Sequence, residues 1–133
     1  MALCNMRTEN GDNGKPATLE DIQLEIQTLD NPQRGDSFRN GAFITIWFEQ
    51  NGTDDEFMQC MPVYPKQSFF LKKLFRKQDE GHKITDYIVE VGRSEKIHAK
   101  QVHGKDELSQ ILTTYFTTHT LPDTSDWEDT GLL

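Results

Sequence analysis

The chain has 133 residues, of which 35% are hydrophobic, and 22 acids against 14 Lys or Arg residues give a net charge of −8. This length predicts one domain that can bury a core without disulfides or metal. No apolar run is long enough to cross a membrane, and the first residues lack the apolar segment of a secretory signal. We therefore expect a cytoplasmic protein in which Cys4 and Cys60 are free thiols.

The charges are distributed unevenly along the chain. Residues 1–56 are mainly acidic, residues 57–105 are mainly basic, and residues 106–133 carry six acids and no base. This order lacks the single dominant basic face that is typical of nucleic-acid-binding proteins. An acidic surface suits a basic protein partner, which it attracts over a distance. The alternative is that the acids only keep a small protein soluble.

The N-terminal part is predicted to be an arm followed by a helix. Residues 1–15 contain Asn-Gly and few apolar residues, which indicates a flexible arm before a single domain at residues 16–133. Thr18 and Asp21 have the spacing of a helix N-cap and its partner. Alternation in this stretch also permits a strand, but the cap favours a helix. Its apolar stripe is Leu19, Ile22, Ile26 and Leu29.

The middle of the chain is predicted to form strands joined by turns. β-Branched and aromatic residues are frequent in four segments, which we predict to be strands. They are residues 42–49, 57–63, 87–91 and 97–102. Residues 50–53 carry a hairpin turn signal, Pro62 suggests an edge or a bulge, and Gly92 ends the third strand. Residues 67–77 fit a strand or a helix, and the turn signals on both sides favour a short strand.

The last helix has the clearest pattern in the sequence, spans residues 105–118, and begins after Gly104. Its apolar residues recur at helical spacing and form one continuous stripe. They are Leu108, Ile111, Leu112, Tyr115 and Phe116. The whole order predicts an α+β fold of two layers, with an antiparallel sheet of four to five strands. The N-terminal and the C-terminal helix would pack on one face of this sheet.

No motif in the sequence indicates catalysis, a metal or a cofactor. The four histidines are scattered, without the spacing of a zinc site. Asp54, Asp55 and Glu56 lack the spacing of a calcium loop, so a solvated hairpin tip is the simpler interpretation. Lys66–Lys77 mixes bases with aromatic residues as nucleic-acid-binding stripes do, but one buried and one solvated face explain it equally. We expect neither an enzyme nor direct nucleic-acid binding.

Trp127 stands among acids in the C-terminal tail. It either folds back over the sheet and pins the tail, or serves as the aromatic anchor of a protein interface. The second interpretation makes the tail acids, and the hairpin tip at residues 54–56, candidate partner-binding residues. The tail acids are Asp123, Asp126, Glu128 and Asp129.

The C-terminal half resembles small immunity proteins of bacterial polymorphic-toxin and contact-dependent growth inhibition systems. The resemblance rests on an apolar strand from Tyr87 to Gly92, a second strand, a helix with Phe116, and a closing segment with Trp127-Glu128. A vaguer likeness extends over residues 17–128. It implies a monomer that binds the toxin domain of its own system in a 1:1 complex and covers the active site or a neighbouring surface.

Such toxins are often nucleases with basic clefts, which an acidic inhibitor would fit. Membrane binding is not expected. The alternative hypothesis is a small ligand- or metal-binding regulatory domain of frataxin-like layout. Its only support is the acidic first helix, with Glu20, Asp21 and Glu25.

Overall fold

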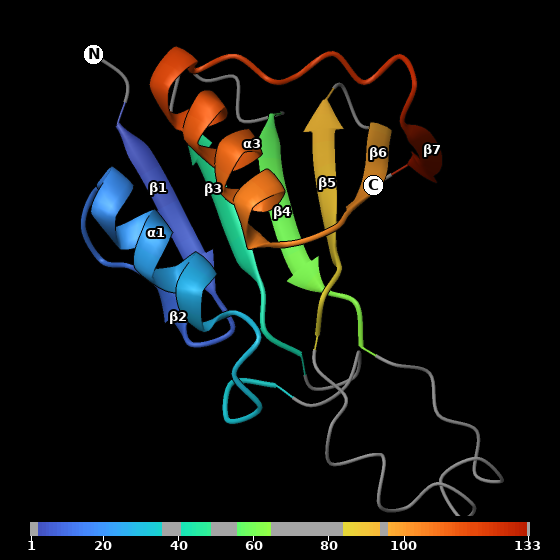
Figure 1. Cartoon of the computed structure of the whole chain (residues 1–133). Helices are drawn as coiled ribbons and strands as arrows, with labels where there is room; N and C mark the ends of the chain where they lie inside the picture. Colours follow the sequence, from blue (N-terminus) through green and yellow to red (C-terminus); the bar gives the residue numbers. More distant parts are fainter. Residues whose placement is uncertain (1–2, 36–40, 49–55, 65–83, 94–95, 133) are drawn as a thin grey trace, which may run out of the picture.

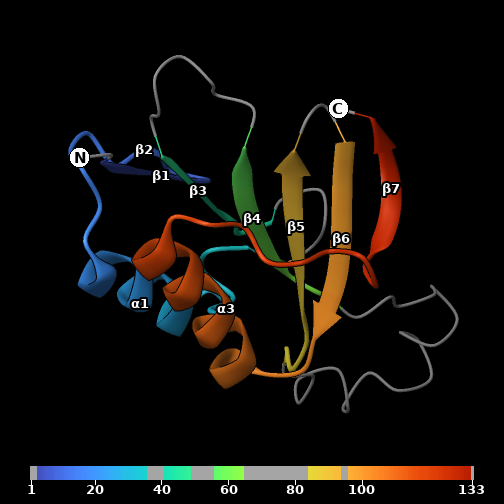
Figure 2. The ribbon, with the colours of Figure 1, turned by 90° about the horizontal axis from the view of Figure 1, so that it is seen from above.

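The computed structural model describes residues 3–35, 41–48, 56–64, 84–93 and 96–132. These residues form a seven-stranded antiparallel sheet with two helices on one of its faces (Figures 1 and 2). The strands are β1 Cys4–Thr8, β2 Gly11–Asp12, β3 Ile44–Phe48, β4 Phe57–Pro62, β5 Tyr87–Arg93, β6 Lys96–Val102 and β7 Glu128–Leu132. The helices are α1 Leu19–Thr28 and α3 Lys105–Thr118. The predicted α+β class is confirmed, and the predicted number of strands was too low.

The strand order in the sheet is β2-β1-β3-β4-β5-β6-β7. Three of these strands, β1, β2 and β7, were not predicted. The four predicted strands form the middle of the sheet as β3 to β6, with ends that differ by a few residues from the prediction. The segment 67–77 and the turn at residues 50–53 lie outside the described residues.

The prediction of a flexible arm at residues 1–15 is wrong, because Cys4–Thr8 forms β1 and pairs with β3. Cys4 and Met6 are buried, which gives the strand a core face that the prediction overlooked. Glu9 and Asn10 form the turn between β1 and β2, and Gly11 begins β2 opposite Thr8. Gly11 has a φ of 108°, a conformation that a glycine adopts without strain.

The first helix begins as predicted. The backbone N–H of Asp21 donates to Thr18 Oγ1 at 3.1 Å, and the backbone N–H of Thr18 donates to Asp21 Oδ2 at 3.0 Å. This reciprocal capping box satisfies two donors that a helix start otherwise leaves open. Ile22 and Ile26 are buried against the sheet side, so the helical stripe is confirmed over the strand alternative.

The core lies between the two helices and one face of the sheet. In β3, β4 and β5 every second side chain is buried, as the two-residue period of a strand requires. Pro62 was predicted to mark an edge or a bulge. It ends β4, which lies between β3 and β5 and pairs with β5 in a continuous register up to Pro62. Gly92 does not end β5 either. It lies within the strand, opposite Phe57, whose ring covers the place where a side chain would stand.

The second helix, α3, has the bounds that the sequence predicted. Leu108, Leu112 and Tyr115 are buried in the core cluster. Tyr115 meets Phe48 of β3 edge-to-face, with ring centroids 5.1 Å apart. The chain beyond α3 then crosses the helix-bearing side of the sheet and returns as β7 beside β6 (Figure 2). No helix among the described residues is long and apolar enough to cross a membrane.

Candidate partner-binding surface

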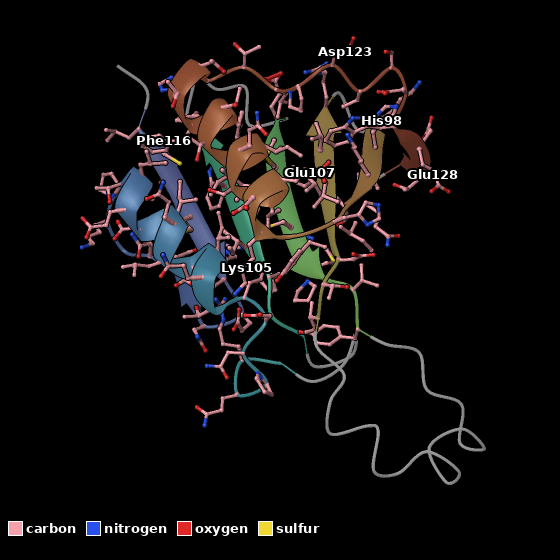
Figure 3. The ribbon with its side chains drawn as sticks, viewed as in Figure 1. His98, Lys105, Glu107, Phe116, Asp123 and Glu128 are labelled. Carbon is pink, nitrogen blue, oxygen red and sulfur yellow. The ribbon has the colours of Figure 1, made fainter. Side chains whose placement is uncertain are left out.

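The predicted partner-binding acids that the structure describes are all exposed. Asp123 and Asp126 lie in the segment between α3 and β7, while Glu128 and Asp129 lie in β7. Figure 3 shows Asp123 and Glu128 on the outer side of this segment, away from the helices. We call these four residues the acidic strip. Glu56 is exposed at the start of β4, and Asp54 and Asp55 lie outside the described residues.

Arg93 lies near both parts of the predicted site, which are the hairpin tip with Glu56 and the C-terminal tail with Asp123. Its Nε lies 3.8 Å from Glu56 Oε2, and its charge also helps to lower the pKa of Asp123. The larger causes of that lowered pKa are hydrogen bonds from Ser125, whose backbone N–H donates to Asp123 Oδ1 at 3.0 Å. The structure therefore brings Glu56 and Asp123 to the same end of the sheet, and one base lies between them.

Trp127 is half-buried and packs against the core cluster. Its backbone N–H donates to the carbonyl oxygen of Thr124 at 3.0 Å, which closes a turn just before β7. Of the two roles predicted for this side chain, the packing supports the one that pins the tail. A role as an interface anchor stays a prediction for the exposed part of the ring.

The strand β7 places the acids beside a basic strand. Asp129 lies opposite His98 in the pairing of β6 with β7, and Glu128 lies opposite Ala99. A bulge interrupts the pairing near Thr130, whose Oγ1 donates to the carbonyl oxygen of Ile97 at 3.0 Å. Figure 3 places His98 close to this edge. Neighbouring residues of a strand face opposite sides of a sheet, and β7 is the edge strand. The acids of β7 therefore lie on both sides of this edge.

The acidic strip consists of exposed side chains. Three pockets that described residues line contain neither Glu56 nor a member of the acidic strip. The described part of the chain also holds no group of three His, Cys, Asp or Glu residues that could bind a metal ion.

Two of the three acids that suggested a frataxin-like metal site have other partners. Glu25 Oε2 lies 2.7 Å from Arg34 Nη1, and the carboxylate of Asp21 belongs to the capping box of α1. Engaged carboxylates of this kind are poorly placed to bind a metal ion as well. The alternative hypothesis therefore loses two of its three supporting residues.

Sequence reasoning missed a second group of polar residues at the other end of β5. His103 Nδ1 lies 3.2 Å from Asp86 Oδ1, and Gln101 Nε2 donates to Asp86 Oδ2 at 2.6 Å. The hydrogen bond to His103 is the largest cause of the lowered pKa of Asp86. The pairing of β5 with β6 brings these residues together, and no sequence motif joins positions so far apart.

Both cysteines are free, as predicted, and the structure also buries both of them. Burial raises the pKa of the Cys4 thiol to about 11 and that of Cys60 to about 12, so neither forms a reactive thiolate at neutral pH. Comparison with known proteins found no matching family model, no matching curated protein and no matching solved structure.

Proposed function

We propose that this chain is a non-catalytic binding protein that neutralises a bacterial toxin domain, as immunity proteins do. The observation that carries the proposal is the acidic strip, a set of exposed carboxylates in a stretch without a single base from residue 106 onward. The resemblance of residues 87–128 to immunity proteins supports the same function. The protein would act in the cytoplasm as a monomer in a 1:1 complex.

The chemistry of the strip defines the kind of partner. Exposed carboxylates contribute little binding free energy one by one, because water screens them. As a group they attract a basic surface and raise the association rate, and they repel acidic partners. A toxin domain with a basic cleft, as in a nuclease, is the partner that such a surface fits. Affinity would come from apolar contacts beside the strip, with the exposed part of Trp127 as one candidate.

The test uses the full chain and the toxin domain encoded by the neighbouring gene. We expect saturable binding in calorimetry and protection of cells that express this toxin. The triple variant Asp126→Lys, Glu128→Lys, Asp129→Lys should bind at least about tenfold more weakly, mainly through a slower association rate. Its unfolding free energy should change little, because the three side chains are exposed.

A matched control separates position from total charge. Glu20 is an exposed acid in the first turn of α1, on the other side of the molecule from β7. Glu20→Lys and Glu128→Lys change the net charge equally, and only the second should slow association, with an effect that salt removes. Equal effects of the two variants would place the interface elsewhere, and no binding to the toxin would refute the proposed function.

A further inference from the structure

The two edges of the sheet differ in what they offer to another chain. One edge is β2, which has only two residues, and the segment after β2 folds back on β1. The backbone N–H of Asn13 donates to the carbonyl oxygen of Met6 at 3.0 Å. The backbone N–H of Ala17 donates to the carbonyl oxygen of Cys4 at 2.8 Å. The chain itself therefore occupies much of the backbone along this edge.

The other edge is β7, which is five residues long. Among the described strands, β7 pairs with β6 alone, and no described strand lies on its outer side. The backbone N–H and C=O groups of a strand point alternately to its two sides, so an edge strand presents part of these groups outward. Figures 1 and 2 show β7 at the end of the sheet, away from both helices. This edge therefore has room for a further strand.

The register of the sheet places an acid on each side of this edge. Val91 of β5 is buried in the core and pairs with His98 of β6. His98 pairs in turn with Asp129, so Asp129 lies on the helix-bearing face and its neighbour Glu128 lies on the open face. Asp126 adds an exposed carboxylate just before the strand. A segment that pairs with β7 would therefore meet carboxylates on both faces of the sheet.

These acids determine which kind of strand can pair with the edge. Charged side chains, and a bulge such as the one at Thr130, protect exposed edges against pairing with further copies of the same chain. A second β7 would bring like charges together, which disfavours a second copy as the partner. A strand with Lys or Arg residues instead gains opposite-charge pairs with the same acids. The bulge limits regular pairing to a short segment.

We propose that the outer edge of β7 binds an extended segment with Lys or Arg at two adjacent positions, which adds an eighth strand to the sheet. The proposal rests on the proposed function, because it describes how a basic toxin domain would be held. Adjacent bases are required because neighbouring side chains of a strand face opposite sides, one beside Glu128 and one beside Asp129. Main-chain hydrogen bonds supply affinity in this mode of binding, and the side chains supply specificity.

The first test uses a peptide as the probe and does not depend on the toxin. The peptide is acetyl-Thr-Val-Lys-Arg-Val-Thr-amide, and its control carries N-methyl groups on all central amides, which keep the charge and remove the donors for pairing. In NMR titrations of the full chain, the peptide should give saturable shifts of the β7 amides with a Kd on the order of 1 mM. The control should bind at least about tenfold more weakly. Equal affinities, or shifts centred on another part of the sheet, would overturn the proposal.

A charge reversal tests the role of the acids. The triple variant Asp126→Lys, Glu128→Lys, Asp129→Lys should bind the basic peptide at least about tenfold more weakly and should bind acetyl-Thr-Val-Glu-Glu-Val-Thr-amide instead. The three side chains are exposed, so the far-UV circular dichroism should stay that of the wild type. Glu20→Lys in α1 is the control and should bind the basic peptide as the wild type does. Unchanged peptide preference of the triple variant would contradict the proposal.

The second test uses the complex with the toxin domain encoded by the neighbouring gene. Hydrogen exchange of the β7 amides should slow at least about tenfold on binding, and intermolecular NOEs should join backbone protons of β7 to a strand of the toxin. A toxin that binds without these NOEs would overturn strand addition and leave the proposed function intact. A toxin that does not bind would refute the proposed function, and the peptide titration then decides the role of β7 by itself.

Discussion

The Arg34 guanidinium donates two hydrogen bonds to the Glu9 carboxylate, from Nε and from Nη2, both at 2.8 Å. Glu9 also accepts the backbone N–H of Phe43 at 3.2 Å, and Arg34 reaches Glu25 of α1 at 2.7 Å. The Arg34 and Glu9 side chains are only 12% and 16% exposed. This bidentate pair joins the end of β1, the helix α1 and the segment before β3.

Arg34→Met should destabilise the fold by about 3 kcal/mol, because it leaves the poorly exposed Glu9 carboxylate without its cation. Urea unfolding measures the loss. Arg7→Met is the control, since the side chains of Arg7 and Asp12 are 56% and 62% exposed. Breaking that exposed pair should leave the urea midpoint almost unchanged, because water screens both charges. Equal losses in the two variants would show that the Arg34 pair is not structural.

The Glu9 carboxylate should make the stability depend on pH. Burial by itself raises the pKa of Glu9, but the hydrogen bonds from Arg34 and Phe43 lower the pKa below its ordinary value. The unfolded chain therefore binds this proton more readily than the folded protein does. The stabilisation is present above about pH 4.5 and is lost as the pH falls through the folded pKa.

The measurement is the urea midpoint between about pH 6 and pH 3, for the wild type and for Glu9→Gln. The wild type should lose stability on acidification over this range. Glu9→Gln should start less stable and have a flatter profile, since its amide does not take up a proton on acidification. Parallel profiles would assign the acid sensitivity to other carboxylates.

Two buried glycines should respond differently to substitution by alanine. A Cβ at Gly35 would lie 2.5 Å from the backbone nitrogen of Ala42 and 2.7 Å from the Tyr64 hydroxyl. The backbone there cannot yield easily, so Gly35→Ala should cost about 3 kcal/mol. At Gly92 the Cβ would meet the outer end of the Phe57 ring, which can turn aside. Gly92→Ala should therefore lower the melting temperature less than Gly35→Ala. A larger decrease for Gly92→Ala in thermal unfolding would contradict this expectation.

Trp127→Ala should destabilise the protein by about 1–2 kcal/mol, because the half-buried indole ring no longer packs against the core. The chain has two tryptophans, so a Trp47→Phe background makes Trp127 fluorescence a reporter of the tail. Its emission should move to longer wavelength before the far-UV circular dichroism changes in urea, as the edge strand detaches first. Coincident transitions would show that β7 is no weaker than the rest of the sheet.

Local chemistry explains which elements could be predicted. The capping pair Thr18 and Asp21 and the helical stripe from Leu108 to Phe116 act over one or two turns, so both helices were predictable. The middle strands were predictable too, because they are rich in β-branched and aromatic residues. In contrast, Glu128–Leu132 is acidic and short, and it becomes a strand only because the edge of β6 offers hydrogen-bond partners.

The functional features divide in the same way. The sequence by itself determined the acidic character of the C-terminal segment and the absence of reactive motifs, since both follow from which residues are present. Only the tertiary structure decided that Trp127 packs on the core, that Arg93 lies between Glu56 and Asp123, and that β7 forms one edge of the sheet. These contacts join residues far apart in the chain, and their positions depend on strand pairing and helix packing that no local pattern encodes.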